Sequence, residues 1–476
     1  MRLAAATLFS AAAAAMFSAV LMFFAGCSAS DGTTKNAPVK PHIVLILADD
    51  MGWTDVGYHG SEIKTPAIDR LAKTGVRLEQ FYTASICSPT RACLMTGRHT
   101  MRYGFQTGVV LPWSEYGLPT TERTLPEALK AAGYYTAICG KWHLGHNQAG
   151  YLPTRRGFDH AYGFYNGAID YFTHMRDEGL DWHRNDSPLE EDGYATTLIA
   201  REAIRVIESH DPAKPLFLYV AFSAPHQPLQ APAEYLERYK NIENGPRRRY
   251  AAMVSCMDDA IADILRALEK RGMEKQTLVL FLSDNGAETH IGNNRPLRGG
   301  KGELYEGGIR VPALVNWPGV LSARTVSEPL HVADLYPTLL ALAGAPSQAD
   351  PPLDGVDVWP AVSQGTALPR KEILLEISPV RGAIRAGEWK LVYNGQINGL
   401  EATKRGRDTY ELFNLEADPG ERQNLSTRYP KILDGLKARL DWYQAQSVPP
   451  YYTSVETPPG YRAPKYWARF PAGKED

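Results

Sequence analysis

Cysteine is scarce in this chain, and its scarcity excludes a fold that depends on a disulfide framework. Only 5 of the 476 residues are cysteine, and a chain of this length can fold on its hydrophobic core alone. An excess of one charge is also missing, because 51 basic and 53 acidic residues leave a net charge of -2. This balance gives no indication of a nucleic-acid partner. No internal repeat is evident either.

The composition that remains is that of an ordinary globular protein, with 44% hydrophobic and 22% charged residues. The length allows one large α/β domain and a smaller one.

The first 26 residues have the character of an export signal. A weakly basic start is followed by an Ala-rich apolar stretch up to Phe24 and then by small residues, which predicts a secretory signal rather than a membrane span. The run Phe24-Ala25-Gly26-Cys27 also resembles a bacterial lipobox, in which Cys27 receives a lipid after cleavage, and residues 27–39 read as a polar tether. The sequence therefore predicts an exported protein that is periplasmic, or anchored by lipid to the outer membrane, in a Gram-negative-type bacterium. Plain cleavage without a lipid is the alternative.

Four apolar, β-rich runs end abruptly in polar residues. They lie at 42–50, 134–143, 215–226 and 277–286. Runs of this kind are typical of parallel strands buried on both faces, and helical patterns lie between them. These patterns begin near Thr65 and Thr124 and extend over 253–268. We therefore predict a large, mostly parallel sheet flanked by helices, with ligands bound beyond the carboxyl ends of its strands.

The pattern changes after about residue 370. Short β-rich segments at 372–377, 383–393 and 410–415 are followed by an amphipathic stretch at 430–446. They predict a smaller α+β domain with an antiparallel sheet. The predicted boundaries are 40–369 for the large α/β domain, 370–448 for the C-terminal subdomain and 449–476 for a tail rich in proline and aromatic residues.

Two pairs of oxygen-bearing side chains follow two of the predicted strands. They are Asp49-Asp50 and Asp284-Asn285. Oxygen ligands without a thiolate suit Ca²⁺ or Mg²⁺. Either pair alone is more typical of a turn or a helix cap, since Asp and Asn dominate turns. Because both pairs converge on the same edge of the predicted sheet, we interpret them as a metal site.

The most informative motif is the run Cys87-Ser88-Pro89-Thr90-Arg91-Ala92-Cys93-Leu94-Met95-Thr96-Gly97. An isolated cysteine is most often a small buried hydrophobic residue. This run, however, resembles the sulfatase signature throughout, and the segment 133–145 resembles the second motif of the same family. Cys87 is predicted to begin a helix, whose N-terminus attracts an anion.

The resemblance implies an alkaline phosphatase-like fold and a modified cysteine. In sulfatases this cysteine is oxidised to formylglycine, so an aerobic or anaerobic maturation enzyme is an expected partner. The implied Ca²⁺ ligands are Asp49, Asp50, Cys87, Asp284 and Asn285. The implied catalytic residues are Cys87, Arg91, Lys141, His143, His226 and Lys301.

A mechanism follows from these residue types. A hydroxyl of the hydrated formylglycine attacks sulfur while Lys141 and Lys301 neutralise charge on the sulfate oxygens. His226 protonates the departing alcohol, and His143 is the base when the second hydroxyl expels sulfate. Taken alone, Lys301 reads as a solvated loop charge and His143 as a structural hydrogen-bonding group; the resemblance raises both to candidates.

The segments 153–159, 214–219 and 293–299 resemble the arylsulfatase B branch, the N-acetylgalactosamine-4-sulfatases. This implies a sulfated glycan as substrate and an exo-acting enzyme that removes sulfate from its end. Asp170, Tyr171 and His174 are predicted to contact the sugar, although a plain surface loop explains them equally well. Two other functions stay open: a phosphodiesterase or phosphonate monoester hydrolase of the same superfamily, and a glycan-binding surface protein with an inactive site.

Overall fold

The computed structural model of the chain describes residues 40–346, 351–401 and 407–468. The predicted export signal at 1–26, Cys27 and the tether at 27–39 lie outside the described residues, as does the end of the tail. Within the described ranges, no helix is both long enough and apolar enough to cross a membrane.

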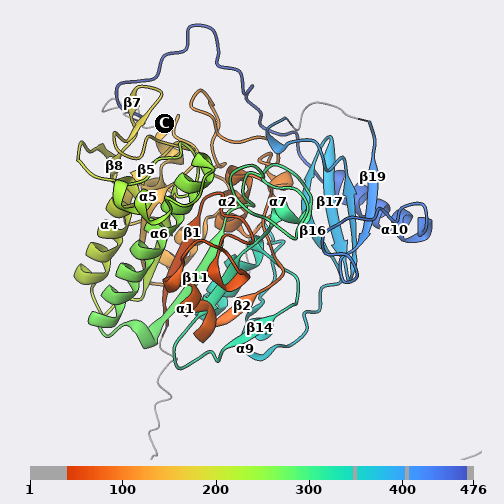
Figure 1. Cartoon of the computed structure of the whole chain (residues 1–476), viewed down its shortest axis with the longest axis horizontal. Coiled ribbons are helices and arrows are strands. Elements are labelled where there is room, and N and C mark those ends of the chain that lie inside the picture. Colours follow the sequence, from red (N-terminus) through yellow and green to blue (C-terminus); the bar gives the residue numbers. More distant parts are fainter. Residues whose placement is uncertain (1–39, 347–350, 402–406, 469–476) are drawn as a thin grey trace, which may run out of the picture. The chain divides into compact units, whose positions relative to one another are not determined.

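A ten-stranded sheet lies at the centre of the fold (Figure 1). In order across the sheet, its strands are β14 (Arg324–Val326), β2 (Val76–Leu78), β13 (Ala313–Asn316), β11 (Thr277–Ser283), β1 (His42–Ala48), β10 (Leu216–Ala221), β4 (Tyr135–Lys141), β5 (His160–Phe164), β8 (His183–Arg184) and β9 (Ser187–Pro188). The strands from β11 to β5 are parallel, whereas β13 and β8 join them antiparallel on the two sides. The predicted fold class, a mixed and mostly parallel sheet, is confirmed.

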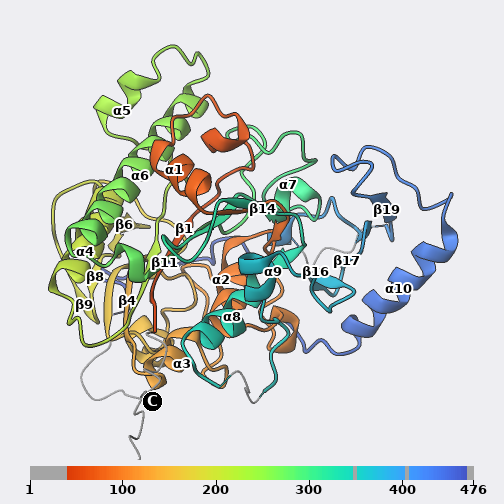
Figure 2. The same cartoon turned by 90° about the horizontal axis from the view of Figure 1, so that it is seen from below.

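The alternation of side chains along β1 explains why both faces of the sheet are covered. Val44 and Ile46 join one hydrophobic core, and Leu45 and Leu47 join the other. Helices α1 (Pro66–Thr74), α4 (Ala195–Ser209) and α6 (Gly245–Lys270) supply the first core, with α5 (Ala233–Arg238) packed on α6. Helices α2 (Cys87–Thr96), α3 (Leu125–Ala131), α8 (Leu335–Leu342) and α9 (Trp359–Gln364) supply the second. Figure 2 shows α1 and α6 on one side of β1 and β11, with α3 and α8 on the other.

The C-terminal region forms a four-stranded antiparallel sheet, as predicted. Its strands in order are β16 (Ile373–Ser378), β17 (Arg381–Ala386), β18 (Trp389–Tyr393) and β19 (Tyr410–Asn414). Gly387 connects β17 and β18 at a φ of 57°, a conformation that favours glycine. Helix α10 (Pro430–Gln444) covers one face of this sheet (Figure 2). The other face packs against α7 (Glu306–Ile309) and its neighbours. The boundary at residue 370 stays a prediction.

Short strands complete the fold. One small sheet joins β12 (Arg310–Val311), β3 (Phe81–Tyr82) and β15 (Leu330–His331), and a hairpin joins β6 (Met175–Arg176) and β7 (Gly179–Leu180). Over its described residues, 445–468, the tail after α10 contains no long helix or strand, but Tyr466 forms a parallel bridge to Leu180 in β7.

Candidate active site

The polar residues after four parallel strands meet at one edge of the central sheet. Asp49 and Asp50 follow β1, Asp284 and Asn285 follow β11, Lys141 ends β4, and the segment after β10 carries His226. Lys301 comes from the loop between β11 and α7 and reaches the same place, where its Nζ lies 2.6 Å from Asp50 Oδ2. The structure thus brings together the residues for which the sequence predicted metal binding and catalysis.

Three carboxylates form the centre of this site. One oxygen each of Asp49, Asp50 and Asp284 lies within 4.8 Å of the others, and all three side chains are buried. Burial and the adjacent Asp284 hold the pKa of Asp49 well above its usual range. Burial acts in the same direction on Asp50, but Lys301, His226 and the hydrogen bond from Asn285 together outweigh it, and the pKa of Asp50 is lowered.

Two oxygen atoms in this group fit a divalent cation. Asp49 Oδ1 and Asn285 Oδ1 are buried and have no hydrogen-bond donor among the described residues. Asn285 instead donates through Nδ2 to Asp50 Oδ1 at 2.7 Å, so its oxygen is free to bind a cation. Carboxylate and amide oxygens are the types of ligand that Ca²⁺ and Mg²⁺ prefer.

Three basic side chains balance the three carboxylates: Lys301, which donates to Asp50, and Lys141 and Arg91. Lys141 Nζ donates to Asp49 Oδ2 at 2.6 Å, and Arg91 donates through Nε and Nη2 to Asp284 Oδ2 at 3.2 and 2.9 Å. Arg91 also bonds the carbonyl of Lys141 at 3.2 Å. These contacts hold the strand ends together at a point where a buried, unpaired charge would be costly.

Cys87 is the first residue of α2, as the sequence predicted, and its side chain is buried. Its Sγ lies within 4.8 Å of one ligand atom each of Asp49 and His226. Burial raises the pKa of this thiol, although Lys141 and Lys301 act in the opposite direction. An unmodified Cys87 is therefore a poor nucleophile, because the thiolate is the reactive form.

The two histidines carry their protons on different nitrogens. His143 Nε2 lies 3.0 Å from the carbonyl oxygen of Val110, so Nε2 donates and the buried Nδ1 is a proton acceptor without a described partner. His226 Nδ1 lies 2.6 Å from the carbonyl of Gln227, so the nitrogen that faces Asp50, at 3.7 Å, is Nε2. Burial and Lys301 lower the pKa of His226 to about 3.

A pocket of about 130 Å³ opens onto Cys87. Besides Cys87, His143, His226 and Lys301, its wall includes the apolar segment 109–112, Arg176 and Leu400. The sequence did not point to these additional residues, because an apolar loop, a single arginine and a single leucine carry no recognisable spacing.

The three residues predicted to contact a sugar use their polar atoms inside the protein. Tyr171 is fully buried, and its hydroxyl donates to the carbonyls of Ser223 and His226, at 2.7 and 2.8 Å. His174 is 1% exposed and stacks on Trp182. The Asp170 carboxylate accepts hydrogen bonds from the amides of residues 172 and 173 and from the side chain of residue 230. Tyr171 thus supports the segment that carries His226, and direct sugar contact by these three residues stays a prediction.

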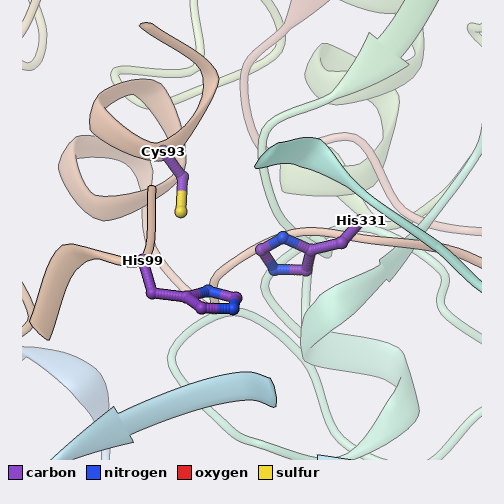
Figure 3. Close-up of side chains that lie close together, drawn as sticks. All are labelled: Cys93, His99 and His331. Carbon is purple, nitrogen blue, oxygen red and sulfur yellow. The ribbon is translucent and has the colours of Figure 1, made fainter. Parts of the chain in front are cut away.

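Cys93, His99 and His331 form another group of possible metal ligands, and their side chains face a common space (Figure 3). Hydrogen bonds within the protein already engage two of them. Cys93 Sγ donates to the carbonyl of Arg98 at 3.1 Å, and His331 Nδ1 accepts from the amide of Ala333 at 3.2 Å. A neutral His331 with that acceptor carries its proton on Nε2, which leaves no lone pair for a metal. We therefore assign this cluster to the packing between α2 and β15.

The sulfatase family profile matches residues 41–345 of this chain, which include every residue of the site described above except Leu400. The chain belongs to the sulfatase family. It is 40% identical to mouse arylsulfatase J over 87% of this chain and 77% of that protein. It is 34% identical to mouse N-acetylgalactosamine-6-sulfatase over 84% of this chain and 85% of that protein. The protein is therefore a sulfuric ester hydrolase; its membership of the arylsulfatase B branch stays a prediction.

Solved structures agree with this assignment. The crystal structure of Ps i-CgsB in complex with k-i-k-neocarrahexaose matches with a TM-score of 0.80 and 34% identity, over 87% of this chain and 95% of that one. The phosphonate monoester hydrolase of Agrobacterium radiobacter matches with a TM-score of 0.60 and 20% identity, over 86% of this chain and 96% of that one. The second likeness shows a shared fold alone.

Proposed function

We propose that this sulfatase is an exported enzyme that removes sulfate from a sulfated glycan, with Cys87 as formylglycine and Ca²⁺ in the carboxylate site. The observation that carries the proposal is the meeting of Cys87 with Lys301 and two histidines in one pocket, beside three buried carboxylates. A protein that only binds glycans has no need of this arrangement. The oxidation of Cys87 by a maturation enzyme and a lipid anchor at Cys27 belong to the same proposal.

The proposed ligands of the cation are Asp49, Asp50, Asp284 and Asn285, together with the modified Cys87. When bound, Ca²⁺ supplies positive charge beside the sulfate and makes a hydroxyl near it more acidic. Formylglycine in its hydrated form supplies two hydroxyls on one carbon, which an unmodified side chain does not have. The buried oxygens of Asp49 and Asn285 that accept no hydrogen bond from the described residues support this ligand set.

The two lysines are proposed to bind the sulfate group. Lys141 and Lys301 now neutralise Asp49 and Asp50, each at 2.6 Å. If Asp49 and Asp50 held a divalent cation, these carboxylates would need less neutralisation by Lys141 and Lys301, and the charges of the two lysines would be available to an anion. Positive charge that is fixed in a buried site stabilises charge that develops in the transition state.

His226 is proposed to hold the proton that the departing alcohol receives. Its pKa of about 3 means that it is neutral when no anion is bound. A bound sulfate offsets the repulsion from Lys301 and Lys141, which raises the pKa of His226 and favours protonation at Nε2. His143 is fixed with a free Nδ1, which suits a base that accepts a proton within the pocket.

The proposed substrates are sulfated sugars at the end of a glycan. The named activity of the mouse relative and the glycan bound to Ps i-CgsB support a carbohydrate substrate. A panel of N-acetylgalactosamine 4-sulfate, N-acetylgalactosamine 6-sulfate and other sulfated monosaccharides would identify the preferred sugar.

Co-expression of the full chain with a formylglycine-generating enzyme tests the chemistry. The peptide that contains Cys87 is expected to show the mass of an aldehyde or its hydrate, and the enzyme is expected to hydrolyse 4-nitrophenyl sulfate faster than 4-nitrophenyl phosphate. Cys87→Ala is expected to abolish turnover, while Cys256→Ala, at a buried thiol in α6, serves as the matched control. Full activity of Cys87→Ala, or faster cleavage of the phosphate ester, would refute the proposal.

A further inference from the structure

A second, larger cavity adjoins the pocket at Cys87. It has a volume of about 790 Å³, and its lining includes Trp113, Arg176, Tyr461 and Arg462. We call it the outer cleft. The pocket at Cys87 is called the inner pocket. Arg176 lines both cavities, and Pro112 of the inner pocket is followed directly in the sequence by Trp113 of the outer cleft. A substrate that extends from Cys87 past Arg176 therefore enters the outer cleft.

The two cavities differ in how much of a glycan each can enclose. Pockets that enclose a small organic ligand measure about 300–1,000 Å³. The inner pocket, at about 130 Å³, is below this range, whereas the outer cleft lies within it. The inner pocket thus accommodates the sulfate and a part of its sugar, and the next sugar lies outside it.

Hydrogen bonds hold the walls of the outer cleft in place. The amide of Leu180, in the hairpin that carries Arg176, donates to the carbonyl of Lys465 in the tail at 3.0 Å. The indole of Trp467 donates to the carbonyl of Arg176, also at 3.0 Å. On the other side, Trp113 Nε1 donates to the carbonyl of Ser454 at 2.9 Å. The cleft is therefore a built feature in which the tail forms one wall.

The side chains in this cleft suit an anionic sugar. The rings of Trp113 and Tyr461 meet edge to face, 5.3 Å apart, and give an apolar corner for the C–H face of a sugar ring. Tyr461 Oη is buried and has no hydrogen-bond partner among the described residues. Arg176 Nε likewise has no hydrogen bond there, and its ion pair with Asp177 is long, at 3.5 Å. Arg462 is exposed in the same cleft.

We infer that the outer cleft binds the sugar next to the one that loses its sulfate, and that Arg176 and Arg462 bind a second anionic group on that neighbouring sugar. The group is a sulfate ester or a carboxylate, since a guanidinium binds either with paired, charge-assisted hydrogen bonds. This inference rests on the proposed function and specifies its substrate class: glycans with an anion on consecutive sugars. Asp177 and Glu178 also line the cleft, and their carboxylates are suited to accept hydrogen bonds from sugar hydroxyls.

A binding experiment tests the cleft without turnover. The ligands are three disaccharides. In each, the terminal sugar is the sulfated monosaccharide that gave the highest kcat/KM in the substrate panel described above. The second sugar is glucose, glucose 6-sulfate or glucuronate. Calorimetry on full-length Cys87→Ala protein is expected to give a Kd about tenfold lower for one of the two anionic disaccharides, or for both, than for the glucose form. The more tightly bound ligand identifies the anion, and equal affinities for all three would overturn the inference.

Variants locate the effect. Arg462→Gln is expected to remove this tenfold gain, whereas Arg428→Gln, at an exposed arginine after β19, retains it. In the matured enzyme, the ratio of kcat/KM for the preferred anionic disaccharide to that for 4-nitrophenyl sulfate is expected to fall about tenfold in Arg462→Gln. If matured enzyme hydrolyses no sulfate ester, the proposed function fails. If it hydrolyses 4-nitrophenyl sulfate but Arg462→Gln matches Arg428→Gln in both measurements, only the cleft inference fails.

Discussion

At the scale of single residues, the charges around a side chain decide what that side chain can do. His226 shows this most clearly, because burial and Lys301 lower its pKa to about 3 while Asp50 lies 3.7 Å from its Nε2. A negative sulfate among these groups favours the protonated ring. We therefore expect this histidine to be neutral without substrate and to donate a proton once a sulfate ester is bound.

Replacing His226 by alanine should affect substrates according to their leaving groups. A sugar alcohol needs a proton as it departs, whereas 4-nitrophenolate leaves readily without one. We expect His226→Ala to lower kcat about 10²–10⁴-fold on a sugar sulfate and far less on 4-nitrophenyl sulfate. Steady-state kinetics on both substrates measure the difference. His290→Ala removes an exposed histidine and serves as the control, and equal losses on both substrates would argue against a proton-donating role.

The sequence predicted the candidate catalytic residues because each belongs to a motif or follows an apolar strand. Residues that act through shape or through a single contact had no such pattern. Arg176 reads as an ordinary solvated arginine, and only the folded chain shows that it lines two cavities. Tyr171 looked suited to a sugar, but its hydroxyl supports the His226 segment, since the path of a loop is not encoded in its composition.

At the scale of secondary structure, the parallel strands act as a unit, because their carboxyl ends bring the acidic residues of β1 and β11 together. The sequence predicted this convergence from the apolar runs. The sequence underestimated the length of α6, which was expected at 253–268 and spans Gly245–Lys270 in the structure. The first turns of α6 carry Arg247, Arg248 and Arg249, so the apolar period is missing there, while Asn244 caps the helix by accepting from the amide of Arg247 at 3.0 Å.

A cation at these strand ends should stabilise the whole fold. A ligand that binds only the folded state at 100 times its Kd adds about 2.7 kcal/mol. We therefore expect Ca²⁺ to raise the Tm and EGTA to lower both Tm and activity. Asp284→Asn should lose the Ca²⁺-dependent shift, and Asp259→Asn, on the surface of α6, should keep it. Differential scanning calorimetry measures the shift, and a Tm that does not respond to Ca²⁺ or EGTA would contradict the metal site.

The C-terminal sheet is joined to the large domain by a buried charge cluster. Lys390 of β18 lies 2.9 Å from Glu306 Oε1 in α7 and 2.8 Å from Glu421 Oε1, and all three side chains are buried. Burial raises the pKa of Glu421 to about 7, against the effect of Lys390 and with the help of Glu306. Lys390 is thus the only described cation that forms an ion pair with both carboxylates.

Removal of this lysine should give a pH-dependent loss of stability. Without Lys390, the folded-state pKa of Glu421, which burial already raises, rises further above its unfolded value. The protonated form of Glu421 is then favoured in the fold, so stability falls as pH rises. We expect Lys390→Met to lower the free energy of unfolding by about 3–5 kcal/mol at pH 8 and by less at pH 5.5. Urea denaturation at both pH values tests this. Lys437→Met, at an exposed i,i+4 pair of α10, should change stability by less than about 0.5 kcal/mol. An equal loss at both pH values would show that packing, and not charge, explains the effect.

At the scale of the whole molecule, the tail connects parts of the chain that are far apart in sequence. The amide of Val448 donates to the carbonyl of Met101, that of Tyr451 to the carbonyl of Gly104, and Tyr466 pairs with Leu180 of β7. Figure 1 shows the tail passing from the C-terminal sheet toward β7. The sequence predicted a tail rich in proline and aromatic residues but not these partners, since proline-rich sequences without an apolar period do not specify what they contact.

Trp467 should fix the end of this tail and, through it, the shape of the outer cleft. Its ring is 3% exposed, packs edge-on against His146 at 5.1 Å and bonds the carbonyl of Arg176. Because a terminal segment can open without unfolding the core, we expect Trp467→Ala to release the tail locally. The amide of Leu180, which donates to Lys465 in the folded tail, should then exchange its hydrogen at least about tenfold faster.

Affinity for the preferred anionic disaccharide should fall in parallel, because Arg462 is carried by the released segment. Trp442→Ala removes an exposed ring of α10 and should change neither measurement. If Leu180 keeps its protection while disaccharide affinity falls, the tail does not act by holding the cleft in place, and Trp467 must influence binding by another route.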